Sequence, residues 1–416
     1  MSTSFRVMAV TALTVLSFQS PAAGQTPSTV ESYNLDDLIR LARERNPDLL
    51  ALRAGRASAD AGRRDSGRFQ NPELEFVTGE GDPFEGGENK TLREFSVSQT
   101  IRNPISRHYR QGALKTLVEA ADEGVNFGTL DVDSEVRLHF YRVLFLEERL
   151  RLARLNEEAL EEVRGLIETR ARVGEVKELE AIRLRVEHMR SENEVSEAIL
   201  ELSQHRQHLN TFLGNTLPGD YSLVGELLSD LVVPAVDQLK ESLLPRHPLV
   251  AQAARQREAA RQNLKATQFQ WIPDPVVSAT SAKELDGDIF KWGFGLQVPL
   301  WNQSRAATER ERQTLRQTEY QEQGLLLELE AELTLHHNHL LLGRQTLQLF
   351  QGGLLEEAEM SMEIAETSYR EGEISLVEYL DARRTFQSIQ LEYQEALYDW
   401  NRELAELNRA VGGGIL

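Results

Sequence analysis

The sequence of 416 residues contains no cysteine. This absence excludes disulfide bonds, thiolate metal sites, a cysteine nucleophile and a lipid-modified N-terminal cysteine. After the first 24 residues, no apolar run approaches the roughly 20 residues that a membrane-spanning helix needs, so any later part that enters a membrane must do so as strands. Basic residues are also in deficit, 46 Lys and Arg against 66 Asp and Glu, which argues against nucleic acid as a partner.

Proline is missing from two long tracts, residues 105–217 and 300–416. Both tracts are rich in Leu, Glu, Arg, Gln and Ala, which are good helix formers. Each tract contains one short break with glycine, at residues 172–175 and 370–373. In each tract we therefore predict a long helix, a tight turn at the glycine and a second helix that returns. The first long helix, about residues 106–170, would measure on the order of 95 Å.

The N-terminal segment has the pattern of a secretory signal peptide. Arg6 precedes an apolar run from Val7 to Phe18, and small residues follow up to Gly24. We therefore predict a signal peptide at residues 1–24 and an exported, bacterial envelope protein.

The rest of the chain is duplicated. Residues 169–214 align without a gap to residues 367–412, so that Gly174 matches Gly372, an offset of 372 − 174 = 198. We predict two structural repeats, residues 25–214 and 235–416, joined by a linker at residues 215–234. Each repeat reads as a short helix, two strands, a long helix, a turn and a return helix.

The two strands of each repeat form a predicted β-hairpin, at residues 72–101 and 275–300. Both hairpin loops are acidic and rich in glycine. In the second hairpin, every second residue from 290 is apolar, which gives the strand one apolar face. These predicted membrane-facing residues are Phe290, Trp292, Phe294, Leu296 and Val298. Taken alone, the pattern fits either a half-buried strand of a soluble core or a lipid-facing strand of an outer-membrane barrel.

Four strands cannot close into a barrel, and open sheet edges are not tolerated in lipid. The smallest membrane barrels have about eight strands, so a membrane barrel requires several copies of the chain. The predicted fold class is mainly α with a small β part. It combines long antiparallel α-helical hairpins, which form an α-barrel, with four β-strands per chain, which form a twelve-stranded transmembrane β-barrel in a trimer.

These features resemble the TolC family of outer-membrane efflux proteins. The resemblance rests on the duplication, on Asn71–Leu74 (NPEL), on Gln297–Leu300 (QVPL) and on the two turns, Val173–Val176 (VGEV) and Glu371–Ser375 (EGEIS). Within the family the chain looks most like the heavy-metal branch, which serves cobalt-zinc-cadmium or copper-silver export. Some relatives in that branch carry a lipidated N-terminal cysteine, which this chain lacks, so its anchoring would rest on the barrel alone.

The resemblance implies a homotrimeric channel in the cell outer membrane, in contact with its lipid and with a periplasmic helical domain. The channel would be the exit duct of a tripartite efflux system, with a periplasmic adaptor (membrane fusion) protein and an inner-membrane pump of the resistance-nodulation-division type. It would conduct substrates passively, with heavy-metal cations among the candidate cargoes. The alternative is an exported structural coiled-coil scaffold without a pore. No catalytic motif is present in the sequence, so we expect neither an enzyme nor a cofactor.

The resemblance also implies a periplasmic gate. Glu378 and Asp381 are three residues apart, so their carboxylates share a helix face. In related ducts, acidic residues at this point of the last helix pair narrow the periplasmic end and bind cations. The equivalent positions of the first repeat are Glu180 and Arg183, and Arg183 would pair with a carboxylate of the neighbouring helix pair. The alternative is that these are ordinary solvated side chains of helices rich in acids.

The two glycine turns are the predicted contacts for the adaptor. Each glycine is expected to supply the positive φ of a tight turn. The residues of these tips are Arg172, Gly174, Glu175, Arg370, Gly372 and Glu373. The alternative for the charged residues is that they only keep the turns soluble.

His336 and His339 share one helix face, and neutral imidazoles are good zinc or copper ligands. His336, however, falls on the apolar seam of the second tract, and the sequence shows no carboxylate that would complete a site. We therefore expect packing or polar roles and no metal site here, and the same holds for the second pair, His205 and His208.

Overall fold

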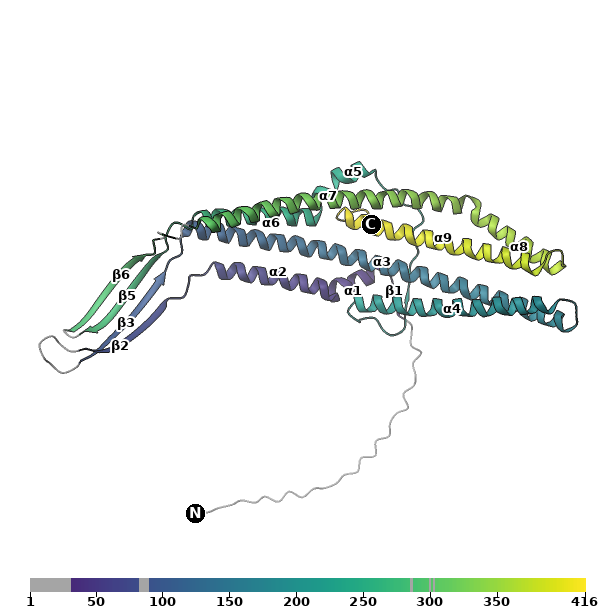
Figure 1. The fold of residues 1–416 in the computed structure, drawn as a ribbon, viewed down its shortest axis with the longest axis horizontal. Coiled ribbons are helices and arrows are strands. Elements are labelled where there is room, and N and C mark those ends of the chain that lie inside the picture. Colours follow the sequence, from purple (N-terminus) through teal and green to yellow (C-terminus); the bar gives the residue numbers. More distant parts are fainter. Residues whose placement is uncertain (1–30, 82–89, 285–286, 299–300, 302–303) are drawn as a thin grey trace, which may run out of the picture.

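The computed structural model describes residues 31–81, 90–284, 287–298, 301 and 304–416. The predicted signal peptide and most of the first hairpin loop lie outside the described residues. The molecule is a long rod that has a β-sheet at one end and two helix tips at the other (Figure 1). The helices between the two ends run along the long axis of the rod.

The two repeats have the same order of elements. The first consists of α1 (Leu35–Arg45), α2 (Pro47–Ser66), β2 (Glu73–Gly81), β3 (Lys90–Thr100), α3 (Pro104–Arg172) and α4 (Glu178–Phe212). The second consists of α5 (Val236–Ser242), a 3-10 turn (Leu244–Arg246), α6 (Pro248–Gln268), β5 (Pro275–Glu284), β6 (Gly287–Leu296), α7 (Arg305–Leu349), α8 (Leu355–Glu371) and α9 (Leu376–Ala410). The mainly helical fold class that the sequence predicts is confirmed.

The predicted linker contains a strand that the sequence analysis missed. Strand β4 (Tyr221–Leu223) pairs in parallel with β1 (Glu31–Tyr33), which precedes the first helix. The start of the chain's described part is thereby fastened beside the connection between the repeats.

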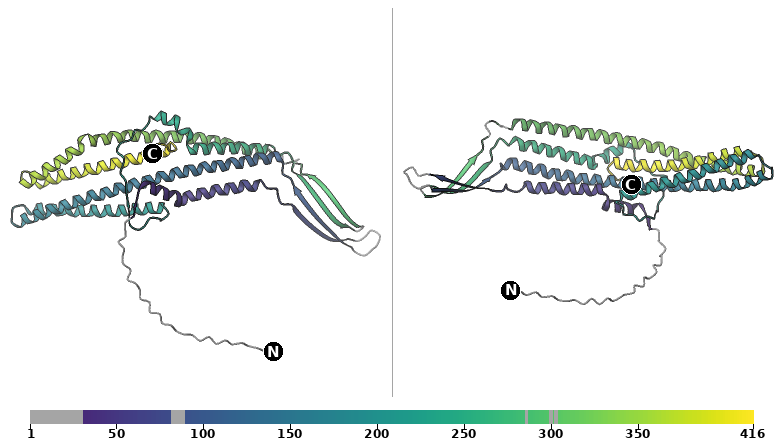
Figure 2. Two further views of the ribbon diagram at one scale, coloured as in Figure 1. Left: turned by 180° about the vertical axis from the view of Figure 1, so that it is seen from behind. Right: turned by 60° about the horizontal axis from the view of Figure 1, so that its bottom comes forward.

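Helix α3 spans 69 residues and forms the axis of the rod. It begins at Asn103, whose side-chain oxygen accepts hydrogen bonds from the backbone N–H groups of Ile105 and Ser106. Pro104 follows at the first helical position, where its missing N–H has no partner to lose. Towards the sheet, α3 packs against α2 and α6; towards the tips, it packs against α4 and α9 (Figure 2).

The second long helix is not continuous, and the prediction of one unbroken helix is wrong at this point. Between α7 and α8 the chain forms a π-helical segment, Phe350–Leu354. Gly353 in this segment has a φ of +129°, outside the helical region. Two adjacent glycines, Gly352 and Gly353, remove the steric barrier to such a bend.

The four longer strands form one antiparallel sheet in the order β2-β3-β5-β6. The hairpins of the two repeats are thus joined through β3 and β5, where Phe95 lies opposite Ser281. Strands β2 and β6 lie at the two edges, each with one neighbour in the chain.

The second hairpin is shorter and tighter than predicted. β6 ends at Leu296, so Val298 lies beyond the strand, and residues 299–300 are outside the described part. Pairing at the other end reaches Glu284 opposite Gly287, within the acidic, glycine-containing stretch between the strands. Gly287 has a φ of +147°, which is accessible to glycine and allows the strands to pair up to the turn.

A similar joint closes each repeat at mid-rod. Asn46 caps α2 and donates from its side-chain amide to the carbonyl of Phe212, at the end of α4. His247 caps α6 and lies 3.2 Å from the carbonyl of Arg409, at the end of α9. Burial lowers the pKa of His247, so its ring is neutral and can accept at Nδ1 while it donates at Nε2. The likeness of the two joints agrees with the predicted duplication.

Three apolar clusters lie along the rod. One surrounds Phe140 and Leu146 of α3, one surrounds Leu333 and Trp400 of α7 and α9, and one at the tips combines both repeats. None of the helices in the described part of the chain combines the length and the apolarity that crossing a membrane requires.

The close packing at the mid-rod joint leads to a testable prediction for Gly412. This residue has a φ of +84°, and an added Cβ would lie 3.0 Å from the Cα of His247. We expect Gly412→Ala to lower the free energy of unfolding by about 1–3 kcal/mol, because the left-handed backbone is strained for alanine. The control is Gly165→Ala on α3, where an added Cβ meets nothing within 4 Å. Equal thermal midpoints for Gly412→Ala and wild type would contradict the tight joint.

Candidate functional site

The large apolar side chains of the sheet gather on one face. One row across the four strands consists of Phe76, Phe95, Ser281 and Phe290, and the next consists of Leu74, Val97, Ala279 and Trp292. Residues directly opposite each other on neighbouring strands share a face, so the apolar positions of the two repeats form one surface. The exposed fractions of Phe290 and Trp292 are 73% and 82%. An apolar surface this exposed indicates contact with lipid or with a partner.

The other face of the sheet is mainly polar, although Val77 and Ile289 also lie on it. One of its rows consists of Glu75, Ser96, Thr280 and Lys291, and the next consists of Glu73, Ser98, Ser278 and Gly293. The ammonium group of Lys291 lies 2.7 Å from the carboxylate of Glu284. The sheet therefore has one mainly apolar face and one mainly polar face.

At the opposite end of the rod, both tips have the turn geometry that the sequence predicts. Gly174 and Gly372 have φ values of +79° and +80°. In each tip the next residue bonds back five positions, from Glu175 to the carbonyl of Arg170 and from Glu373 to that of Ser368. This pattern is the Schellman motif, which requires a left-handed residue at the glycine position.

The charged residues beside the glycines are exposed. Arg370 pairs with Glu366 at 2.6 Å on its own helix, and Arg172 bonds to the backbone carbonyl of Glu168. Glu175 and Glu373 are exposed, and Glu373 accepts a hydrogen bond from the hydroxyl of Ser368. These residues remain available to a partner, and their contact with an adaptor stays a prediction.

The predicted gate residues lie at the same height along the rod, just beyond the two tips. Glu378 accepts hydrogen bonds from the backbone N–H and the hydroxyl of Ser375 and so completes a capping box at the start of α9. These bonds lower the pKa of Glu378, so its carboxylate is ionised at neutral pH. Asp381 is exposed, one turn further along the same face. Their arrangement on one face agrees with the prediction, and the gate itself stays a prediction.

The first-repeat counterparts behave differently. Glu180 is half-buried and close enough to Tyr369 for its charge to raise the pKa of that phenol, although burial is the larger cause. Arg183 is exposed, and within the described part of the chain its side chain has no carboxylate partner. The expected pairing of Arg183 with a carboxylate of a neighbouring helix pair is not made within one chain and stays a prediction. The ion pair between the two helix pairs is instead made by Arg384 of α9 and Glu187 of α4, at 2.6 Å.

Stacked aromatic rings hold α8 and α9 together at the same level. Tyr369 and Tyr379 lie with their ring centroids 5.0 Å apart. They belong to the cluster that also contains Ile167 and Leu184 of the first repeat. The two helix pairs thus form one packed end, from which the acids of the predicted gate project.

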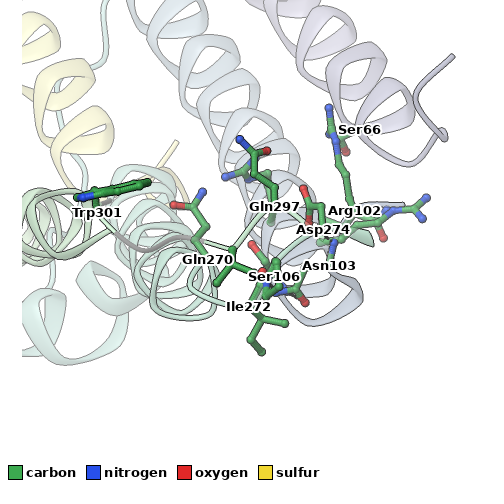
Figure 3. A pocket seen from close by; sticks show the side chains of 14 residues that line it. Ser66, Arg102, Asn103, Ser106, Gln270, Ile272, Asp274, Gln297 and Trp301 are labelled. Atoms are coloured by element: carbon green, nitrogen blue, oxygen red, sulfur yellow. Dashed lines mark hydrogen bonds between the residues drawn. The ribbon is translucent and has the colours of Figure 1, made fainter. Parts of the chain in front are cut away.

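A cavity of about 670 Å³ lies where the sheet meets the helices (Figure 3). Its wall includes Arg102, Arg107, Asp274 and Trp301. Asp274 accepts a hydrogen bond from the backbone N–H of buried Asn103, which ties the second repeat to the first. The cavity thus forms part of the joint between the sheet and the rod.

The histidine pair on α7 has a partner that the sequence does not reveal. Nδ1 atoms of His336 and His339 lie 2.8 and 3.2 Å from one carboxylate oxygen of Glu403 on α9. Burial raises the pKa of Glu403, but hydrogen bonds from His336, Arg402 and His339 outweigh it and lower this pKa to about 2. The expectation that no carboxylate joins the pair is therefore wrong. The expectation that His336 lies on the apolar seam is also wrong, because the buried histidine on this helix is His337.

A sequence profile of the family described as "Outer membrane efflux protein" matches residues 239–413. The second repeat of the chain is thus similar to this family. The outer-membrane location and the efflux function that the sequence predicts are thereby confirmed. The matched region contains the second repeat from α6 to α9, including the apolar strand and the predicted gate acids.

Relatives of this efflux protein match over nearly the whole chain. The cobalt-zinc-cadmium resistance protein CzcC of Cupriavidus metallidurans is 23% identical, over 95% of this chain and 92% of its own. The pyoverdine export outer membrane protein OpmQ of Pseudomonas putida is also 23% identical, over 95% and 91%. The solved structure of the outer-membrane channel OprN superimposes with a TM-score of 0.78 at 18% identity, over 91% and 90% of the chains. The predicted likeness to the heavy-metal branch is confirmed, and a pyoverdine exporter is similar as well.

From the exposed aromatic face of this efflux protein we predict how a charged side chain introduced on that face affects assembly. Arginine in place of a lipid-facing residue costs about 2–4 kcal/mol near the midplane of a bilayer and less near its surface. We expect Phe294→Arg to reduce the yield of assembled protein in the outer membrane. Lys291→Glu, on the polar face of the same strand, is the control and should assemble normally. Equal yields of the two variants in fractionated membranes would show that the assigned facing is wrong.

Proposed function

We propose that three copies of the chain form the exit duct of a tripartite efflux system. Their sheets close a twelve-stranded barrel in the outer membrane, with Phe290, Trp292 and Phe294 towards lipid and the polar face towards the lumen. The helices continue this barrel as a helical tube in the periplasm. The proposal is carried by the four-stranded sheet, which has one exposed aromatic face and two unpaired edges. A sheet of this kind is stable in lipid only when further copies pair with its edges.

The same sheet argues against the alternative of a scaffold without a pore. A periplasmic scaffold surrounded by water would expose Trp292 and Phe290 to solvent at a cost in hydrophobic free energy. It would also have no reason to align the apolar positions of two separate hairpins in one register. A barrel that faces lipid accounts for both observations.

The helix tips are the proposed contact for a periplasmic adaptor protein, which in turn joins an inner-membrane pump of the resistance-nodulation-division type. Support comes from the two tips themselves, which lie at the end of the rod away from the sheet (Figure 1). Their exposed charges, Arg172 and Glu175 on one tip and Arg370 and Glu373 on the other, suit a polar docking contact. The duct itself is proposed to conduct passively and not to act as an enzyme.

Heavy-metal cations are the proposed cargo. This finer proposal rests on the similarity to CzcC, whose name refers to cobalt-zinc-cadmium resistance, and on the acidic charge of the chain. The equal similarity to a pyoverdine exporter makes an organic cargo the alternative outcome. Growth of a deletion strain on cobalt, zinc and cadmium salts distinguishes the two.

Purified protein in planar bilayers tests the duct and its gate together. We expect wild-type trimers to conduct, and divalent cations added on the periplasmic side to block the current. Glu378→Gln with Asp381→Asn should conduct without this block, because three copies lose the six carboxylates that attract the cations. Glutamine at position 378 can keep the capping box with Ser375, so the start of α9 is preserved.

The matched control removes two other exposed acids, Glu356 and Glu357 in the first turn of α8. Glu356→Gln with Glu357→Gln should be blocked like the wild type. If cations block the gate variant at the same concentrations as the wild type, Glu378 and Asp381 are ordinary solvated acids of the helix. Recovery of the wild type as a soluble, non-conducting monomer would contradict the duct itself.

A further inference from the structure

Three potential metal ligands from two helices converge at mid-rod. The Nδ1 atoms of His336 and His339 on α7 both face the same oxygen, Oε2, of Glu403 on α9. Glu403 is buried, whereas the side chain of His339 is 49% exposed, so the cluster is open to solvent on one side. In the described part of the chain, these three residues are the one group of His, Asp and Glu whose ligand atoms approach one another closely enough to hold an ion.

The spacing of the three atoms is close to that of ligands around a small cation. Zinc binds imidazole nitrogen and carboxylate oxygen at about 2.0–2.1 Å in tetrahedral geometry, which separates neighbouring ligand atoms by roughly 3.3 Å. The two nitrogen-to-oxygen distances are 2.8 and 3.2 Å, and the three atoms lie within 4.8 Å of one another.

The surroundings prepare the carboxylate for this role. Arg402 bonds to the other oxygen, Oε1, at 2.9 Å and so fixes the carboxylate with Oε2 towards the imidazoles. A cavity of about 390 Å³ adjoins the cluster, and Glu392, Glu395 and Asp399 contribute to its wall. Arg402 also lines this cavity and pairs with Asp399 at 2.9 Å, so Glu392 and Glu395 supply the net negative charge that favours a cation. The open side leaves room for water as a fourth ligand.

We propose that His336, His339 and Glu403 bind a divalent transition-metal cation of the zinc, cobalt, nickel or copper class. Two nitrogen ligands and one oxygen ligand select these ions over magnesium and calcium, which prefer oxygen alone. The bound ion links α7 to α9 next to the linker between the repeats, where His337 lies 3.1 Å from the carbonyl of Pro234 and Asn401 donates to that of Leu228. The bound ion therefore cross-links the two helices and resists sliding of α7 along α9. The proposal does not rest on the duct function, since binding is measurable without conduction.

Zinc binding by the purified full-length protein, prepared with an affinity tag that contains no histidine, tests the site. We expect equilibrium dialysis to show one tightly bound Zn²⁺ per chain and Co²⁺ to give the visible absorption of a tetrahedral nitrogen–oxygen site. Glu403→Gln and His339→Ala should each weaken binding at least tenfold, because even residues behind the ligands change metal affinity by about 10–100-fold. Zinc should also raise the thermal midpoint of the wild type and not of these variants.

A second histidine pair supplies the matched control. His205 and His208 on α4 are also three residues apart, with ring centroids 6.0 Å apart, but they do not belong to the convergent group. The double variant His205→Ala, His208→Ala should retain wild-type zinc binding. His339→Ala serves where Glu403→Gln fails to fold, since His339 is largely at the surface. Unchanged zinc affinity in His339→Ala, or equal loss in the control, would show that the cluster is only a hydrogen-bonded contact between helices.

Discussion

Unpaired backbone groups along the two edges of the sheet are the constraint on which the account of this protein depends. Strands β2 and β6 contain 9 and 10 residues, and each has a neighbour in the chain on one side only. Each backbone polar group left without a partner in hydrocarbon costs several kcal/mol. The aromatic face of the same strands, however, favours lipid over water. Both demands are satisfied together only when the edge of one copy pairs with the edge of the next.

The duplication explains how one chain builds a rod that is long enough to follow such a barrel. Each repeat contributes one hairpin to the sheet and one helix pair to the tips, and Asn103 and Asp274 join them below the sheet. Asn46 and His247 then lock the end of each return helix to the start of its repeat. The predicted gate acids Glu378 and Asp381 lie on α9 together with Glu403, the partner of His336 on α7, so a movement of α9 would affect the tip and the mid-rod together.

Features with a local signal could be predicted from the sequence, whereas features that depend on distant contacts could not. The absence of proline predicted the long helices, Gly174 and Gly372 predicted the tips, and the alternation from Phe290 predicted the facing of β6. The bend at Gly353 was missed because two glycines within a strong helical pattern do not by themselves specify a break. Glu403 was missed because it is 64 residues from His339 in the chain and reaches it only through the packing of α7 on α9. Likewise, the pairing of β1 with β4 depends on a contact between the start of the first repeat and the linker that follows it.

Cross-linking between the outer edges of the sheet tests the central claim most directly, since the chain has no cysteine of its own. Glu75→Cys on β2 would be combined in turn with Ile289→Cys, Lys291→Cys and Gly293→Cys on β6, to sample the registers on the polar face. Within one chain these strands are three spacings apart, roughly 14 Å, well beyond the Cα separation of about 7 Å that a disulfide can bridge. Any disulfide must therefore join different chains. We predict that one register gives covalent trimers after mild oxidation of outer membranes, and that the single-cysteine variants do not. Covalent dimers alone, open-ended polymers, or no cross-link in any register would contradict a closed barrel of three chains.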